Sequence, residues 1–377
     1  QCSPLHMYQK LEHKGQKWGI FGWICLVGNV ALIAFYSVVC GWLIYYFVKF
    51  LAGQSSLLSF EGMITNPAVN VIFLLITLAF AFGVLCFHLQ GGLERVTKYI
   101  MSALLVLMAV LAIRSLTLPG AKDGMVFYLK PDFSKINGTV FVGAMNQAFF
   151  TLSTGMGGMA IFGSYIGKER SLMGEAIHVI VLDTLVAVLA GIIIFPACMT
   201  YGLEVTAGPS LLFDTMAAVF SHMPGGQIWG TLFFLFMIFA AMSTVLGVCE
   251  NILAMIREKT GWSRKKGSLV CGSTLFLLAL TTALGYSVLH FQPFAKGTTW
   301  LDFWDFLVST NILPLGSLVL SLFCCNGFGW GWDAFVQEAN TGIGLKVKGW
   351  MKPIFRYVVP ISIGFIYLYG ILTFQWR

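Results

Sequence analysis

Long apolar runs recur along the whole chain and dominate what it can fold into. A membrane helix needs about 20 mainly apolar residues to cross the hydrocarbon layer, and nine segments meet this requirement. Apolar residues make up 58% of the 377 residues, charged residues only 10%, and the mean hydropathy is +0.82. This composition leaves too little polar surface for a water-soluble protein. We therefore predict an all-α, polytopic membrane protein with a single transmembrane domain over residues 1–377. The predicted spans are residues 18–48, 69–88, 98–117, 140–163, 172–200, 228–256, 268–288, 305–325 and 355–375.

The distribution of basic residues predicts which end of the chain faces the cytoplasm. If residue 1 lies inside, the inner side holds 16 of the 23 Lys and Arg residues and the outer side holds seven. Basic residues concentrate on the cytoplasmic side of membrane proteins, so we expect the N-terminus inside the inner (plasma) membrane and the C-terminus outside. This topology accounts for the net charge of +7. No nucleic-acid partner is needed, and apart from the lipid bilayer no obligatory protein partner is evident.

One apolar run, residues 140–163, contains a glycine-rich interruption. It reads Gln147-Ala-Phe-Phe-Thr-Leu-Ser-Thr-Gly-Met-Gly-Gly158. Glycine weakens a helix and tolerates backbone conformations that other residues avoid, so we expect a discontinuous helix here. Inside a membrane, irregular backbone is tolerated only where it is buried in protein or lines a cavity. Its free carbonyls suit a hard cation and the amide end of a half-helix suits a carboxylate, which is typical of a transporter site.

Two other spans contain polar residues, and these residues differ in how strongly they indicate a binding site. Asp183 stands in the middle of its span, where an acid costs about 2.5–3.5 kcal/mol on insertion scales. It could be protonated or paired with an arginine inside the bundle, but its position favours a bound cation. For the adjacent hydroxyls of Ser243 and Thr244, the residues alone favour ordinary hydrogen bonds between packed helices.

Several motifs occur in the order found in one family. The chain resembles the neurotransmitter:sodium symporters, whose fold is the LeuT-type inverted-repeat helix bundle. Phe35-Tyr-Ser-Val-Val-Cys-Gly-Trp42 resembles the third helix of that family, the glycine-rich interruption its broken sixth, Phe239-Ala-Ala-Met-Ser-Thr244 its eighth, and Leu301-Asp-Phe-Trp304 the start of its tenth. The nine spans would then be helices three to eleven of a bacterial eleven-helix member. The resemblance also implies that this chain is a fragment, beginning in the first intracellular loop and lacking the first two helices.

The resemblance assigns roles to residues at the matching positions. A first sodium site would use Thr151 and Asp183, and a second the carbonyl of Ala240 with the hydroxyls of Ser243 and Thr244. This second assignment reverses the packing interpretation that the residues alone favour. The substrate would contact Leu32, Tyr36, Phe150, Thr151, Ser153, Met156 and Val248. The gates would be Phe150 and Asp302 on the outer side, and Tyr165 and Glu258 on the inner side.

The expected function is sodium-coupled symport of an amino acid into the cell by alternating access. Met156 stands where some relatives carry phenylalanine, and the flexible thioether favours hydrophobic or aromatic substrates. Chloride-dependent members place a serine at the position of Ala187, so we expect no chloride requirement. The alternative is a membrane sensor or partner subunit that keeps the fold without transporting. An enzyme is not expected, because no nucleophile, base and orienting group occur together.

Overall fold

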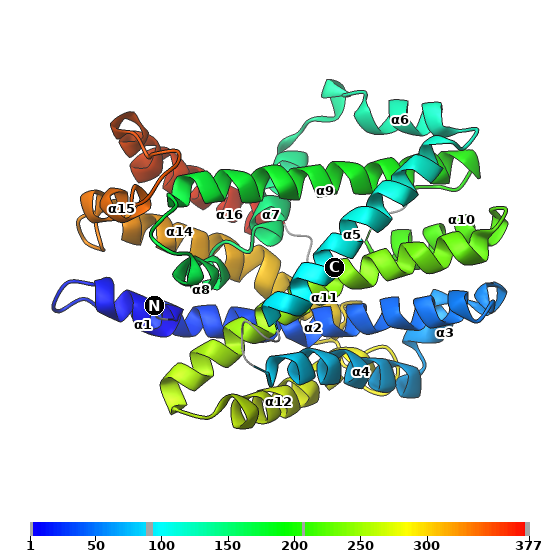
Figure 1. The fold of residues 1–377 in the computed structure, drawn as a ribbon, viewed down its shortest axis with the longest axis horizontal. Helices are drawn as coiled ribbons and strands as arrows, with labels where there is room; N and C mark the ends of the chain where they lie inside the picture. The colour runs from blue at the N-terminus through cyan, green and yellow to red at the C-terminus, as the bar shows by residue number, and fades with distance from the viewer. Residues whose placement is uncertain (1–2, 88–92, 206–207, 374–377) are drawn as a thin grey trace.

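The protein is a bundle of helices. The structure, a computed structural model, describes residues 3–87, 93–205 and 208–373, and every regular element in these ranges is a helix (Figure 1). Eight helical stretches in the described ranges are long and apolar enough to cross a membrane, and each coincides with a predicted span. Six are single helices: α2 (Ile20–Leu51), α4 (Pro67–Leu85), α5 (Leu93–Leu116), α9 (Leu172–Thr200), α11 (Gly226–Thr260) and α12 (Arg264–Leu284).

The last two spans are interrupted by π-helical segments. One joins α13 (Trp300–Asp305), the π-helix η4 (Phe306–Ile312) and α14 (Leu313–Cys325). The other joins the 3-10 turn η5 (Gly349–Met351), the π-helix η6 (Ile354–Val358) and α16 (Val359–Thr373).

The remaining predicted span, residues 140–163, is broken. It consists of α7 (Gly138–Thr151) and α8 (Gly158–Tyr165). Between them Ser153, Gly155 and Gly157 have positive φ angles of 47°, 83° and 74°, a region that favours glycine. Gly155 is also needed for space, because a Cβ atom there would lie 2.5 Å from the carbonyl oxygen of Leu313 in α14. The predicted discontinuous helix is thus confirmed.

Asparagine caps begin the spanning helix α4 and the first half of the broken span, α7. The side chain of Asn66 accepts a hydrogen bond from the backbone N–H of Val69, at the start of α4. The side chain of Asn137 accepts one from Val140 at the start of α7. Each cap satisfies a backbone donor that the helix leaves free and is worth about 1 kcal/mol. These caps place the beginnings of both helices.

Short helices that the sequence analysis did not predict fill the connections. They gather at the two ends of the bundle, with α3, α6 and α10 towards one end and α1 and α15 towards the other (Figure 1). They are α1 (Pro4–Leu11), η1 (Ser55–Leu57), α3 (Phe60–Ile64), α6 (Ala121–Leu129), η2 (Phe133–Lys135), η3 (Leu211–Thr215), α10 (Met216–His222) and α15 (Trp332–Ala339).

Helices α2 and α11 form the centre of the bundle and pack along each other (Figure 1). At one end, Tyr46 and Phe50 of α2 contact Phe234 of α11, with ring centroids 5.2 and 5.3 Å apart. All three side chains are fully buried, and such aromatic pairs add stability beyond their buried area. Of the broken helix, α8 packs against α11, whereas α7 packs against η4, α14 and α16.

Candidate substrate and sodium sites

The end of α7 meets the middle of α9 through two predicted sodium ligands. The hydroxyl of Thr151 donates a hydrogen bond of 2.7 Å to Oδ1 of Asp183. Asp183 is half-buried, and among the described residues no Lys, Arg or His forms an ion pair with it. A carboxylate with oxygen neighbours and no cation fits a hard cation such as sodium. The structure therefore brings together the two side chains predicted for the first sodium site.

The second group of predicted sodium ligands lies on one turn of α11. The hydroxyl of Ser243 donates a hydrogen bond of 2.7 Å to the carbonyl of Ala240, so the two oxygens already face each other. Thr244 follows directly, and its side chain lies close to the hydroxyl of Tyr36 in α2. These hydroxyl and carbonyl oxygens are the ligand type that a hard cation prefers.

A cavity of about 180 Å³ lies between α2, the break and α11. Five predicted residues line it, namely Ser153, Met156, Ser243, Thr244 and Val248. Six further lining residues were not predicted as site residues, namely Asn29, Gly158, Met159, Phe162, Gly247 and Asn251. The cavity wall is therefore largely apolar. Its polar side chains are the hydroxyls of Ser153, Ser243 and Thr244 and the amides of Asn29 and Asn251.

Four predicted substrate contacts are not among the lining residues. Leu32 is buried in the core at 2% exposure. Tyr36 and Phe150 are half-buried, whereas Thr151 is exposed and bonded to Asp183. Their roles stay predictions.

The two asparagines of the cavity could have been found from their spacing. Asn29 lies seven residues before Tyr36 on α2, and Asn251 lies seven residues after Thr244 on α11. Residues seven apart share a face of a helix, so each amide lies on the face of a predicted pocket residue. Both are nearly fully buried, at 1% and 4% exposure.

Two of the predicted gate residues, Asp302 and Glu258, form contacts within the structure. Asp302 is exposed and forms a capping box with Thr299 at the start of α13. Glu258, near the end of α11, accepts a hydrogen bond of 2.7 Å from the backbone N–H of Ser3 and lies 3.2 Å from Nδ1 of His6. The side chain of Tyr165 lies outside the described part of the structure. Gating by these residues stays a prediction.

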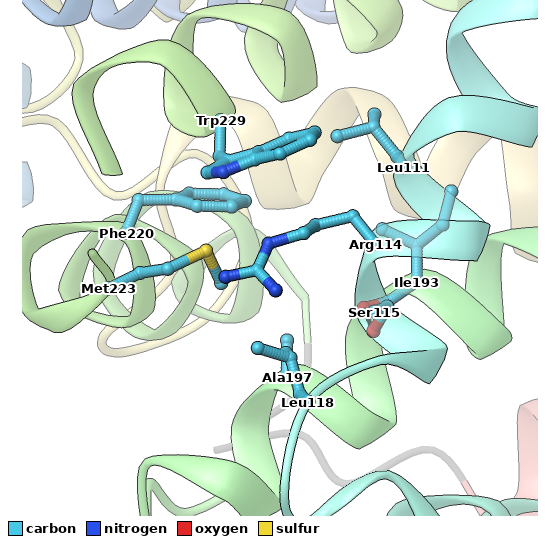
Figure 2. A pocket seen from close by; sticks show the side chains of 9 residues that line it. All are labelled: Leu111, Arg114, Ser115, Leu118, Ile193, Ala197, Phe220, Met223 and Trp229. Atoms are coloured by element: carbon cyan, nitrogen blue, oxygen red, sulfur yellow. Dashed lines mark hydrogen bonds between the residues drawn. The ribbon is translucent and has the colours of Figure 1, made fainter. Parts of the chain in front are cut away.

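A second, much smaller cavity lies at Arg114 (Figure 2). The Arg114 guanidinium carbon is 5.4 Å from the ring centroid of Trp229, and Phe220 and Met223 lie beside it (Figure 2). The volume is about 10 Å³, room for about one water molecule. We interpret this region as a packed cation–aromatic contact rather than a ligand site.

Comparisons with known proteins identify the family of the chain. Residues 54–377 match the model of the sodium:neurotransmitter symporter family. The uncharacterized sodium-dependent transporter YhdH of Bacillus subtilis is 32% identical over 99% of this chain and 84% of its own length. An uncharacterized sodium-dependent transporter of Haemophilus influenzae is 32% identical over 93% of this chain and 79% of its own length.

A solved structure is also similar to this chain. The crystal structure of MhsT in complex with L-phenylalanine superposes with a TM-score of 0.87 at 33% identity, covering 97% of this chain and 84% of MhsT. A likeness over this much of both chains extends to the fold and the family. The chain therefore belongs to the sodium:neurotransmitter symporter family, as a sodium-dependent, multi-pass membrane transporter with the LeuT-type fold rather than an enzyme.

Proposed function

We propose that the protein carries a hydrophobic or aromatic amino acid into the cell together with sodium. The observation that carries this proposal is the contact between Thr151 and Asp183 beside the break, close to a largely apolar cavity. Irregular backbone next to an acid at membrane depth is the arrangement that transporters use to bind a coupling ion and a substrate together.

Two sodium sites are part of the proposal. Asp183 supplies a negative charge to the first site, and the oxygens of Ala240, Ser243 and Thr244 supply the second. Because Asp183 brings its own charge, and Ala187 offers no hydroxyl to an anion, coupling does not require chloride. Each sodium ion that moves inward down a membrane potential contributes about 2.3 kcal/mol per 100 mV.

The cavity supports an apolar substrate side chain. Met156 and Val248 are 2% and 6% exposed, and Met159 and Phe162 extend the apolar wall. Tyr36 and Ser153 stand near the polar end, where the substrate's charged groups would bind. MhsT, whose structure contains L-phenylalanine, gives a first ligand to test.

The inward sodium gradient and the membrane potential would drive transport into the cell. Transport would proceed by alternating access, with sodium ordering the broken helix before a group of helices rocks against α2 and α11. A sensor or partner subunit with the same fold would bind sodium and the amino acid but would not move them. Flux and binding therefore need to be measured separately.

Equilibrium binding tests the ligands. The protein, expressed from its complete reading frame and purified, is titrated with labelled L-phenylalanine, tryptophan, leucine, alanine and glutamate. Each titration is done in sodium chloride, potassium chloride and sodium gluconate. We expect saturable binding of the apolar amino acids in both sodium salts and none in potassium chloride. Binding that ignores sodium, or requires chloride, would contradict the proposed coupling.

A further inference from the structure

Two consecutive carbonyls of the break are held by side chains of α2. The thiol of Cys25 lies 3.6 Å from the carbonyl oxygen of Gly155, and Nδ2 of Asn29 donates a hydrogen bond of 2.8 Å to that of Met156. Cys25 and Asn29 are one helical turn apart and so present their donors on one face. The break is thus fastened to α2 where its backbone lacks helical hydrogen bonds of its own.

A second amide fixes the orientation of the first. Nδ2 of Asn29 also donates to the carbonyl of Cys25, at 2.7 Å, so both of its N–H groups face carbonyl oxygens. Oδ1 of Asn29 is left to accept, and Nδ2 of Asn251 in α11 donates to it at 3.3 Å. The chain of donors therefore runs from α11 through α2 to the break, and its bonds set the orientation of the Asn29 amide. Oδ1 of Asn251 is buried without a hydrogen-bond partner among the described residues.

The first residue of α8 fits closely against this chain. A Cβ atom at Gly158 would lie 2.8 Å from Nδ2 of Asn251, closer than atoms of these types approach. Glycine at this position therefore lets the start of α8 approach the Asn251 amide. Met156, which accepts from Asn29, and Gly158 bracket the point where the chain becomes helical again.

We propose that Cys25, Asn29 and Asn251, here called the break latch, are positioning residues for transport. Cys25 and Asn29 hold the carbonyls of Gly155 and Met156 against α2, and Asn251 of α11 supports Asn29. The latch thereby fixes where the break places Thr151 and Ser153 for sodium and substrate. This inference rests on the proposed function for its transport role. Buried amides inside membrane helices are costly unless bonded. Here Asn29 bonds directly to the break at Met156, and Asn251 supports Asn29.

The hydrogen bonds of the latch must break or rearrange if the broken helix moves relative to α2 and α11. Losing the Asn29 amide would free the carbonyl of Met156. Movement of the break away from α2 would then uncover the thiol of Cys25, which is 3% exposed and also packs with Tyr8 and Phe323. Reaction of Cys25 with a thiol reagent therefore reports directly on the latch, independently of substrate binding.

The test compares latch variants with a matched control. The variants Asn29→Ala, Asn29→Leu and Asn251→Ala remove an amide, and Asn29→Leu preserves most of its volume. The control Asn70→Ala removes another buried asparagine, which is 2% exposed and bonds to Trp42 and to three backbone carbonyls away from the break. For each protein we measure N-ethylmaleimide modification of Cys25 by peptide mass spectrometry and the sodium concentration that half-saturates L-phenylalanine binding.

We expect each latch variant to raise the rate of Cys25 modification. We also expect it to weaken sodium affinity about tenfold, because supporting groups around an ion site typically matter by that factor. The combination of Asn29→Ala with Asn251→Ala should equal the stronger single variant, since the residues act as a unit. Asn70→Ala should leave both readouts unchanged, even if it unfolds at a lower temperature.

Latch variants that behave like Asn70→Ala in both readouts would overturn the proposal. Faster Cys25 modification with unaltered sodium affinity would also overturn the positioning role, because the latch would then be structural only. If the unmodified protein binds no amino acid in sodium, the proposed function fails. In that case the rate of Cys25 modification alone tests the latch, and equal modification rates in all variants would overturn the proposed latch.

Discussion

Two acids inside spanning helices, Glu250 in α11 and Asp183 in α9, have opposite surroundings. Glu250 is 2% exposed, and the guanidinium of Arg264 in α12 contacts both of its carboxylate oxygens, one of them at 3.2 Å. Asp183 receives one hydroxyl, that of Thr151 at 2.7 Å, and forms no ion pair with any described residue. The carboxylate of Glu250 thus has a cationic partner, whereas that of Asp183 has none among the described residues.

The difference separates an acid that serves the fold from one that serves a ligand. Arg264 also donates to the carbonyl of Leu85 at the end of α4, so the Glu250 pair ties three helices together. Asp183 faces the end of α7 next to irregular backbone, where a cation can bind without displacing a protein charge. We infer that Glu250 contributes mainly to stability and Asp183 mainly to sodium affinity.

The largest effect is expected on stability when the Glu250 pair is broken. Glu250→Ala leaves Arg264, which is 15% exposed, without its partner, and removing one partner of a buried pair costs about 3–5 kcal/mol. Thermal unfolding in detergent, followed by size-exclusion chromatography, should show a clear loss of folded protein. Replacing both residues by leucine should recover part of that loss. A Glu250→Ala protein as stable as the unmodified one would contradict the structural role.

Asp183→Ala should reverse this pattern. We expect sodium-dependent L-phenylalanine binding to weaken about tenfold or more, equivalent to about 1.4 kcal/mol or greater, with little change in thermal unfolding. Asp183→Asn serves as the control that keeps an oxygen but removes the charge. Its sodium-dependent binding should lie between that of the unmodified protein and that of Asp183→Ala. An unchanged sodium titration in Asp183→Ala would remove this residue from the ion site.

A smaller effect is expected at the second group of oxygens. Thr244→Val keeps the shape but removes one ligand oxygen, so sodium affinity should fall about fivefold, or just under 1 kcal/mol. The matched control is Thr282→Val in α12, where the buried hydroxyl has no hydrogen-bond partner in the described structure. If the two variants have the same sodium affinity, Ser243 and Thr244 are packing residues.

The smallest effect is expected on substrate choice. Met156 lines the cavity, and its sulfur would lie 3.1 Å from a Cβ atom at Gly28, so the site is tight. Met156→Phe should shift the ratio of tryptophan to alanine affinity by about threefold towards alanine, because a rigid ring cannot move aside. Competition binding measures this ratio. An unchanged ranking of tryptophan, leucine and alanine would place Met156 outside the pocket.

The spans and the break could be predicted because their causes are local in the sequence. Hydropathy over 20 residues marks a membrane helix, and Gly155 and Gly157 mark a backbone that leaves the helical region. The contact of Thr151 with Asp183 was expected only through the family resemblance, since residues 32 positions apart reveal no distance by themselves. The π-helical segments η3, η4 and η6 carry no comparable local signal.

Other features were missed for identifiable reasons. The amide pair of Asn29 and Asn251 depends on the register between α2 and α11, which one sequence does not contain, although the seven-residue spacings could have drawn attention to it. Asp302 was predicted only as a gate, but Thr299 followed three residues later by an acid is a capping-box pattern that the sequence contains. The structure forms that box.

Uptake into liposomes tests the central claim most directly. The protein, made from its complete reading frame, is reconstituted into vesicles loaded with potassium, and accumulation of labelled L-phenylalanine is followed after dilution into sodium. We predict accumulation above the external concentration, stronger when the interior is made negative, and none without the sodium gradient or in Asp183→Ala vesicles. Uptake that merely equilibrates L-phenylalanine, at the same rate with and without a sodium gradient, would contradict sodium-coupled transport.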